Sequence, residues 1–261
     1  MLADKSKGLL LIAGPCLIES WETCARVAER VKELAARHEL NLIYKASYRK
    51  ANRTSGTSPR GIGDQEALAI LSKVRAHFDL RVTTDVHEVA EVKMVSPVCD
   101  LIQIPAFLCR QSELVEAAAR TGLPVNIKKG QFLAAEDMGL IADKARHAGA
   151  TEVLLTERGT SFGYRDLIVD FRSFQIMKSH GCPVIFDATH SVQRPGAVAG
   201  VSGGDREFIP MLLRAALAAG ADGIFLETHP DPAHAQSDRM TQWPLDQLPD
   251  LLEGLEDHGL L

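Results

Sequence analysis

Short apolar runs recur along the chain, and amphipathic stretches lie between them. Most of these runs are almost continuously apolar, which is typical of strands that are buried on both faces of a parallel sheet. The eight runs span residues 9–16, 40–47, 81–86, 100–105, 124–129, 152–157, 183–189 and 223–228. Alternating strand and helix units of this number predict an α/β fold, a single-domain (β/α)8 TIM barrel over residues 1–261.

Two of the connecting segments show a helical period with particular clarity. Ser20 precedes the first, 21–37, and is expected to cap its N-terminus. The predicted apolar stripes are Val27, Val31 and Leu34 in the first segment and Ile209, Leu212, Leu213 and Ala216 in the second, 206–219. The alternative architecture, a doubly wound open sheet, usually has five or six strands and a glycine-rich first turn that this chain lacks.

Composition narrows the class of protein further. The length of 261 residues matches one barrel, and 46% apolar with 24% charged residues predicts a folded domain. A net charge of -5 argues against a protein that follows a nucleic-acid backbone, so an anionic ligand needs a local cluster of cations. Five cysteines without a CxxC pair predict a reducing, cytoplasmic location. The apolar run 9–13 is too short for an export signal, and no run is long enough for a membrane span.

Ionisable side chains end most of the predicted strands. In a (β/α)8 barrel these carboxyl ends meet at one mouth, where active sites lie. Such groups are costly to bury, so their repeated placement at strand ends predicts a functional site there. They are Cys16, Lys45, Asp85, Lys128, Lys129, Glu157, Arg158, His190, Glu227 and His229.

A group of cations at these ends predicts a phosphorylated ligand. Lys45, Lys50 and Arg53 follow the second strand, Lys129 ends the fifth, and Arg158 follows the sixth. A single lysine of this kind is more often a solvated loop residue. As a set on one face of a barrel, the five side chains can bind an anion, with arginine able to grip a phosphate through two bonds.

Four further residues could hold a metal ion. Cys16, His190, Glu227 and Asp238 come from the first, seventh and eighth strands and the loop that follows, and these strands are neighbours in a closed barrel. A thiolate, an imidazole and two carboxylates suit a divalent Fe, Mn, Co or Zn ion. Taken alone, Cys16 is more often a small buried hydrophobe, and His190 a hydrogen-bonded strand-end residue. The competing ligands are His180, His229 and His234.

Nine sequence motifs carry a resemblance to a known family. They are IAGPCLIES at 12–20, KANRTS at 50–55, TTDVHE at 83–88, IQIPAFLCRQ at 102–111, NIKKGQF at 126–132, LTERG at 155–159, FDATHSVQ at 186–193, SGGDREF at 202–208 and ETHPDP at 227–232. In this order, and over nearly the whole chain, they resemble the 3-deoxy-D-manno-octulosonate 8-phosphate synthases. The family condenses phosphoenolpyruvate with D-arabinose 5-phosphate and water in lipopolysaccharide biosynthesis.

The resemblance also implies metal dependence and an oligomer. Members with Cys at the end of the first strand are metal-dependent and members with Asn there are not, so Cys16 places this chain in the metal-dependent class. The metal ligands implied are Cys16, His190, Glu227 and Asp238. The family is usually a homotetramer, in which Arg110 is expected to reach the sugar phosphate of a neighbouring subunit and 202–208 to form a lid.

Roles for individual residues follow from the same motifs. Phosphoenolpyruvate is expected to bind Lys45, Lys50, Gln103, Ala106, Lys129, Arg158 and His190. The sugar phosphate is expected to bind Asn52, Arg53, Thr54 and Arg110. The expected catalytic residues are Cys16, Lys45, Lys50, Asn52, His190 and Asp238. The chain departs from the family at Thr54, where Ser is usual, and at 56–61.

Three other functions remain open at this stage. A related synthase condenses phosphoenolpyruvate with erythrose 4-phosphate for aromatic biosynthesis, but it typically has KPRTS where this chain has KANRTS, with Asn52. A synthase for an unphosphorylated sugar would leave Arg53 and Arg110 without their phosphate. A barrel without catalytic activity is the third, since fold alone does not determine function.

Overall fold

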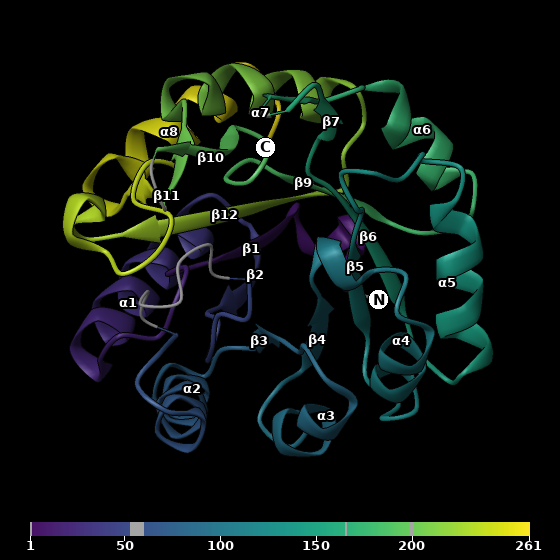
Figure 1. Cartoon of the computed structure of the whole chain (residues 1–261). Coiled ribbons are helices and arrows are strands. Elements are labelled where there is room, and N and C mark those ends of the chain that lie inside the picture. Colours follow the sequence, from purple (N-terminus) through teal and green to yellow (C-terminus); the bar gives the residue numbers. More distant parts are fainter. Residues whose placement is uncertain (1, 53–59, 165, 199–200) are drawn as a thin grey trace.

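The computed structural model describes residues 2–52, 60–164, 166–198 and 201–261, and it confirms the predicted barrel (Figure 1). All eight barrel strands are parallel, and β1 pairs with both β2 and β12, which closes the sheet. The strands are β1 (Leu10–Gly14), β2 (Asn41–Lys45), β3 (Val82–Asp85), β4 (Leu101–Ile104), β5 (Val125–Lys128), β6 (Val153–Glu157), β9 (Val184–Asp187) and β12 (Gly223–His229).

Helices surround the strands, one after each (Figure 1). They are α1 (Trp21–Arg37), α2 (Asp64–Phe78), α3 (Val89–Val95), α4 (Ser112–Ala119), α5 (Met138–His147), α6 (Arg172–Lys178), α7 (Ile209–Ala218) and α8 (Leu248–Glu256). Ser20 caps α1 as predicted, because its Oγ accepts the Thr23 N–H at 3.1 Å. No helix within the described ranges is long and apolar enough to cross a membrane.

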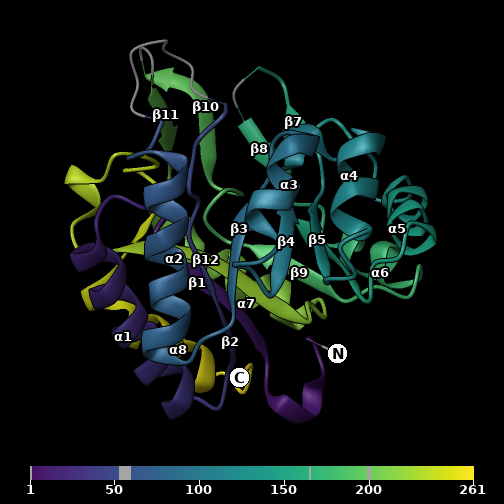
Figure 2. The same ribbon diagram turned by 90° about the horizontal axis from the view of Figure 1, so that it is seen from below.

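Smaller elements decorate the two ends of the barrel. Two hairpins, β7–β8 and β10–β11, project at the carboxyl ends of the strands, while both chain termini lie at the opposite end (Figure 2). The small strands are β7 (Thr160–Phe162), β8 (Asp166–Ile168), β10 (Gln193–Val198), β11 (Val201–Gly204) and β13 (Trp243–Pro244). The 3-10 helices are η1 (Lys5–Lys7), η2 (Ala106–Leu108), η3 (Arg206–Phe208), η4 (Pro232–His234) and η5 (Leu245–Gln247).

Two apolar clusters hold the barrel together, one on each side of its wall. The larger cluster fills the shell between strands and helices, for example with Val125 and Ile127 of β5. We call the smaller cluster, inside the barrel, the lower layer; it consists of Leu10, Ile12, Ile43, Leu101, Leu154, Ile185 and Phe225. Residues that alternate along each strand therefore enter different cores.

The N-terminal residues close the lower end of the barrel. Leu2 and Ala3 pack against the lower layer. The Leu2 N–H donates to Glu152 Oε2 at 2.6 Å, and Asn41 Nδ2 donates to the Leu2 carbonyl at 2.5 Å. The opposite end is left for the polar side chains that follow the strands.

The structure corrects some predicted boundaries. Seven of the eight strands are shorter than their apolar runs, and β12 is one residue longer. β9 ends at Asp187, so His190 lies in the following turn and not at the end of the strand. The predicted helix 206–219 begins as the 3-10 turn η3, and Pro210 lies in the first turn of α7. Within its stripe, Leu212 is only partly buried.

Candidate active site at the carboxyl ends of the barrel strands

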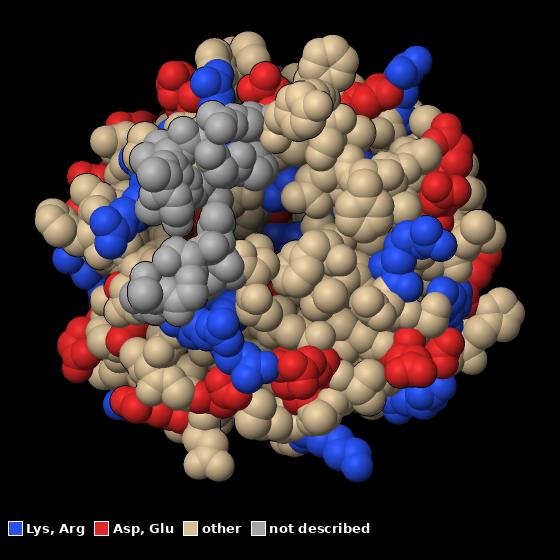
Figure 3. All heavy atoms as spheres, in the orientation of Figure 1, with Lys and Arg blue, Asp and Glu red and all other residues tan. Residues whose placement is uncertain are grey.

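On five strands, the apolar interior gives way to polar side chains two positions further along. On β2, β4, β6, β9 and β12 the inward-facing residue nearest the carboxyl end follows a lower-layer residue by two positions, as Lys45 follows Ile43 and Glu227 follows Phe225. Together with Asp85 of β3 and Lys128 of β5, we call these residues the upper layer: Lys45, Asp85, Gln103, Lys128, Thr156, Asp187 and Glu227, all buried. Figure 3 shows lysine and arginine atoms at the floor of a hollow in the centre of this face.

Three of the four predicted metal ligands converge above β1 and β12. Cys16, Glu227 and Asp238 each offer a ligand atom, and these atoms all lie within 4.8 Å of one another. The Cys16 thiol donates to Asp238 Oδ2 at 2.9 Å. Glu227 Oε2 is buried and has no hydrogen-bond partner among the described residues, as expected for an oxygen that coordinates a metal ion.

The backbone brings these residues together at two special positions. Gly14 lets the end of β1 approach β2, because a Cβ there would lie 2.1 Å from the Lys45 carbonyl oxygen. Asp238 has a left-handed backbone with φ 47°, a conformation that non-glycine residues rarely adopt. Its carboxylate accepts hydrogen bonds from the Cys16 thiol, the Ser237 hydroxyl at 3.0 Å and Gln193 Nε2 at 2.5 Å. These contacts hold the carboxylate in the mouth.

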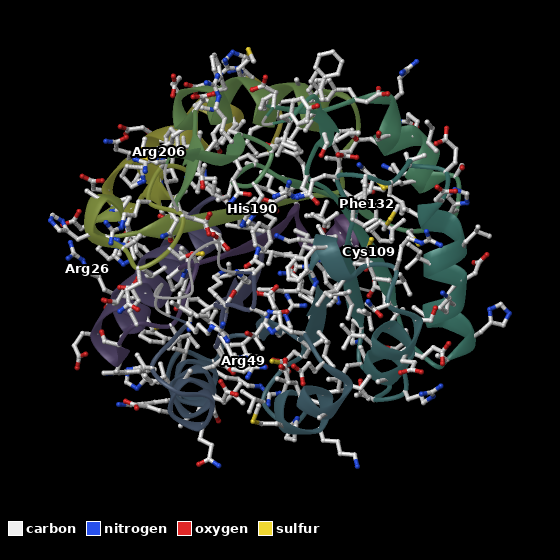
Figure 4. The ribbon with its side chains drawn as sticks, in the orientation of Figure 1. Arg26, Arg49, Cys109, Phe132, His190 and Arg206 are labelled. Carbon is white, nitrogen blue, oxygen red and sulfur yellow. The ribbon has the colours of Figure 1, made fainter. Side chains whose placement is uncertain are left out.

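His190, the fourth predicted ligand, lies over the centre of the barrel (Figure 4). Asp187 holds its ring, with Oδ2 at 2.8 Å and Oδ1 at 3.0 Å from Nδ1. The other ring nitrogen, Nε2, lies 3.7 Å from Glu227 Oε2. A carboxylate on one imidazole nitrogen and a metal on the other is a common arrangement in metal sites.

Each cation of the mouth is matched by a carboxylate. Among the described residues, four cations and four carboxylates surround this region, so their formal charges cancel. The contacts pair Lys45 with Glu227 at 2.6 Å and Lys128 with Asp187 at 2.6 Å, join Lys50 to Asp85 through Ser47, and join Arg158 to Asp238 through Gln193. An anion therefore needs further positive charge to bind tightly.

The two consecutive lysines of the NIKKGQF motif point to opposite sides of the barrel wall. Lys128 faces inward: its Nζ lies 3.5 Å from His190 Nδ1 and 3.4 Å from the centre of the Phe225 ring. Lys129 faces outward, where its Nζ donates to Thr160 Oγ1 at 3.0 Å. Lys128, not Lys129, is thus the lysine that the structure brings to the other predicted cations.

Arg158 reaches the mouth from the turn after β6. Its Nη2 donates to Gln193 Oε1 at 2.8 Å, while its Nη1 is buried with no hydrogen-bond partner among the described residues. A buried guanidinium nitrogen of this kind fits a phosphate or carboxylate oxygen of a ligand.

A directed chain of hydrogen bonds fixes Gln103. Thr156 Oγ1 donates to Asn126 Oδ1 at 2.7 Å, Asn126 Nδ2 donates to Gln103 Oε1 at 3.0 Å, and Gln103 Nε2 donates to Asp85 Oδ1 at 2.5 Å. The Ser47 hydroxyl donates to the other oxygen of Asp85. The chain thus ends on Asp85, and the hydrogen bonds that its carboxylate accepts from Gln103 and Ser47 stabilise its charged form.

The remaining predicted residues lie around the rim or outside the described ranges. Ala106 is buried at the start of η2, whereas Asn52 and Arg110 are exposed. Arg53 and Thr54 fall outside the described residues, as does most of the divergent segment 56–61. The predicted lid 202–208 forms the end of β11 and η3. Of the competing histidines, His229 pairs with Glu19 at 3.7 Å and His234 with Asp231 at 2.7 Å.

The charge states follow from burial and pairing. Burial, together with Asp238 and Glu227, raises the pKa of the Cys16 thiol, so a bound cation is what favours its thiolate. Burial opposes ionisation of Asp187, but His190 and Lys128 outweigh it and lower the pKa of that carboxyl. Burial lowers the pKa of Lys128, and Asp187 only partly offsets this.

Sequence reasoning missed several residues of this site. Asp187, Gln193, Asn126 and Gln242 orient other groups through hydrogen bonds; the Gln242 side chain, for instance, accepts the Cys16 N–H at 3.0 Å. Asp187, Gln193 and Asn126 lie within the sequence motifs, and Gln242 lies four residues after Asp238. The sequence gives no other indication of their roles. The mouth thus combines buried cations with a cluster of metal-ligand types, a combination that suits chemistry on anionic molecules beside a divalent ion.

The comparisons with known proteins agree with this geometry. Residues 2–259 match the sequence profile of the DAHP synthetase I family, and the chain belongs to that family. Its relatives include a protein of Acidithiobacillus ferrooxidans, 54% identical over 250 residues, which cover 95% of this chain and 89% of the relative. A protein of Dechloromonas aromatica is 53% identical over 255 residues, with 97% and 92% covered. Both are named 2-dehydro-3-deoxyphosphooctonate aldolase, so the resemblance seen in the motifs is confirmed.

Proposed function

We propose that the chain condenses phosphoenolpyruvate with D-arabinose 5-phosphate and water to form 3-deoxy-D-manno-octulosonate 8-phosphate and inorganic phosphate, for lipopolysaccharide biosynthesis. The aldolase name of the relatives denotes this same synthase activity. The observation that carries the proposal is the upper layer. It places paired cations, Arg158 and a cluster of metal-ligand types at one mouth, in a chain more than half identical to proteins with that name.

The cations would hold phosphoenolpyruvate over the floor of the mouth. Lys45, Lys50 and Arg158 were predicted for this role, and Lys128 joins them because it faces the same space. Gln103, held by Asn126, would present its amide to the ligand beside Ala106. Asn52, Arg53, Thr54 and Arg110 remain the residues proposed for the sugar phosphate. Fixing both reactants within attack distance replaces a costly encounter in solution.

Cys16, His190, Glu227 and Asp238 would hold a divalent Fe, Mn, Co or Zn ion. The fit rests on the mixed donor set, on Glu227 Oε2, which accepts no hydrogen bond from the described residues, and on the His190 ring held by Asp187. When bound, such an ion supplies positive charge and Lewis acidity to a carbonyl or water oxygen. It would also add positive charge to a mouth whose described cations and carboxylates balance.

Proton handling would fall to the chain's own residues. Asp187 holds His190 Nδ1 and leaves Nε2 for the metal ion, so the proton would be carried by Lys128, whose Nζ donates to the same Asp187 at 2.6 Å. Burial lowers the pKa of Lys128, so this ammonium releases a proton more readily than an exposed lysine. We further propose a cytoplasmic homotetramer, in which the exposed Arg110 would complete a neighbouring mouth.

The substrate assignment is tested by phosphate release. The purified chain, supplied with phosphoenolpyruvate and a divalent metal, should release phosphate with arabinose 5-phosphate and much less with erythrose 4-phosphate. Release with erythrose 4-phosphate but not with arabinose 5-phosphate would instead identify the synthase of aromatic biosynthesis. Release with an unphosphorylated sugar would identify the synthase that acts on such a sugar. No release with any sugar would leave a barrel without catalytic activity.

A further inference from the structure

Lys129 and Glu157 form a buried ion pair outside the barrel wall. Lys129 follows β5 and Glu157 ends β6, and both point away from the upper layer toward the helices. Their side chains are 1% and 0% exposed, and Nζ lies 3.5 Å from Oε1. Removing both charges of such a pair from water costs free energy, so a buried pair next to the mouth suggests a role beyond stability.

Glu157 holds the turn that presents Arg158. Its Oε1 accepts the Gly159 N–H at 2.7 Å, which bridges the two residues on either side of Arg158. Gly159 has φ 89°, a left-handed conformation that lets the chain reverse there. Arg158 then points back into the mouth, toward Gln193.

Lys129 ties this turn to the loop after β5. Its Nζ donates to Thr160 Oγ1 at 3.0 Å and to the Leu133 carbonyl at 3.4 Å. The two segments also share a backbone bond, from Ser161 N–H to the Gln131 carbonyl at 2.9 Å. Phe132 of this loop lies to the side of the mouth, toward α5 (Figure 4). The lysine therefore joins two segments rather than facing the hollow.

The charged form of Glu157 depends on the neighbouring charge of Lys129. Burial raises the pKa of the Glu157 carboxyl, and Lys129 is the first group that opposes this. Glu157 Oε2 has no hydrogen-bond partner among the described residues. Loss of the lysine would leave a buried carboxylate without a counter-charge, and the turn at Arg158 would lose its support.

We propose that Lys129 and Glu157 are a positioning pair: they hold the turn that carries Arg158 and so set the affinity of the mouth for phosphoenolpyruvate without touching it. This inference rests on the proposed function. It gives Lys129 a different role from the direct contact that its motif implies, and the two roles predict different outcomes in a double variant.

The test compares Lys129→Met, Glu157→Gln and the double variant. Lys129→Met should raise the KM for phosphoenolpyruvate about tenfold and lower Tm by roughly 10 °C, with the KM for the sugar phosphate nearly unchanged. The double variant should recover most of both losses. The amide of Glu157→Gln needs no counter-charge and can still accept the Gly159 N–H.

Lys128 supplies the matched control. Lys128→Met should also weaken phosphoenolpyruvate, but adding Glu157→Gln should restore nothing, because Lys128 pairs with Asp187 inside the barrel. A double variant of Lys129→Met with Glu157→Gln that regains its Tm yet keeps the high KM would show that Lys129 contacts the ligand directly. That result would overturn the proposal, and so would an unchanged KM in Lys129→Met.

Two further readouts cover a single variant that does not fold. Glu157→Gln alone keeps Lys129 and should still raise the KM for phosphoenolpyruvate about threefold, since the turn is held less firmly; no change contradicts the proposal. The shift of Tm on adding phosphoenolpyruvate can be measured without turnover. A failed sugar assignment therefore appears in the wild-type assay, whereas a failed positioning role appears only when the variants are compared with the wild type.

Discussion

On five strands, the lower and upper layers of the barrel interior lie only two residues apart, yet one layer is apolar and the other is polar and charged. Ile43, Leu101 and Ile185 belong to the apolar floor, and Lys45, Gln103 and Asp187 directly above them form hydrogen bonds and ion pairs. Two residues span about 7 Å along a strand. The fold thus obtains its stability and its chemistry from neighbouring positions of one alternating pattern.

Phe225 joins the two layers. Its ring belongs to the floor, yet Lys128 Nζ lies 3.4 Å and Lys45 Nζ 5.4 Å from its centre, and the His190 ring centre is 5.8 Å away. An aromatic face attracts cations while it fills apolar space. The floor therefore also supports the cations of the mouth from below.

The largest effect is expected from an upper-layer cation. Lys128→Met should lower kcat/KM by about 100- to 1,000-fold, because it removes a cation proposed to contact phosphoenolpyruvate and takes from Asp187 its lysine partner. Steady-state kinetics measure this loss. Lys178→Met, which breaks a pair with Asp222 on the outside of the barrel, is the control and should keep its turnover. Similar activity in both variants would remove the distinction between the two regions.

A lower-layer substitution should act on stability instead. Ile43→Ala removes a fully buried side chain and should cost about 2–5 kcal/mol in the free energy of unfolding, while Ile43→Val should cost about 0.5–1.5 kcal/mol. Urea titration gives both values. The KM of each substrate should stay close to that of the wild type in Ile43→Val. A large change of KM in that variant would mean that the floor is part of the binding site.

The smallest effect concerns how the free energy of unfolding depends on pH. Of the two layers, only the upper one contains groups that titrate. Burial opposes the charge of Asp85, but Lys45 and Lys50 outweigh it and lower the pKa of that carboxyl. The stability it contributes is present above its unfolded pKa and is lost as the pH falls toward the lower folded value. Asp85→Asn should therefore flatten the acid side of a plot of unfolding free energy against pH. Parallel curves for variant and wild type would contradict this pairing.

The sequence predicts the fold well because burial on both faces leaves a plain signal. Eight apolar runs mark the strands, but an apolar run does not show where pairing stops, so most strand ends are predicted too late, as with His190 after β9. The start of α1 was readable because a Ser cap has a local cause. The 3-10 turn before α7 has no comparable signal.

The site was only partly predictable, for the same reason. Cys16 and Glu227 were found because they end strands that are neighbours in a closed barrel. The direction of Lys128 and Lys129 was not readable, since Val125 and Ile127 are as apolar as an inward-facing pair would be. Residues that act on other residues, such as Asp187 on His190, depend on contacts that exist only in the folded chain.

The central claim is that the mouth needs a divalent ion held by Cys16, His190, Glu227 and Asp238. The most direct measurement is turnover of phosphoenolpyruvate with arabinose 5-phosphate by metal-depleted protein, as Mn²⁺ is added back and bound metal is counted. We expect no turnover without metal, full turnover at about one bound ion per chain, and neither binding nor recovery in Cys16→Ala. Full turnover by protein verified to be free of metal would contradict the account.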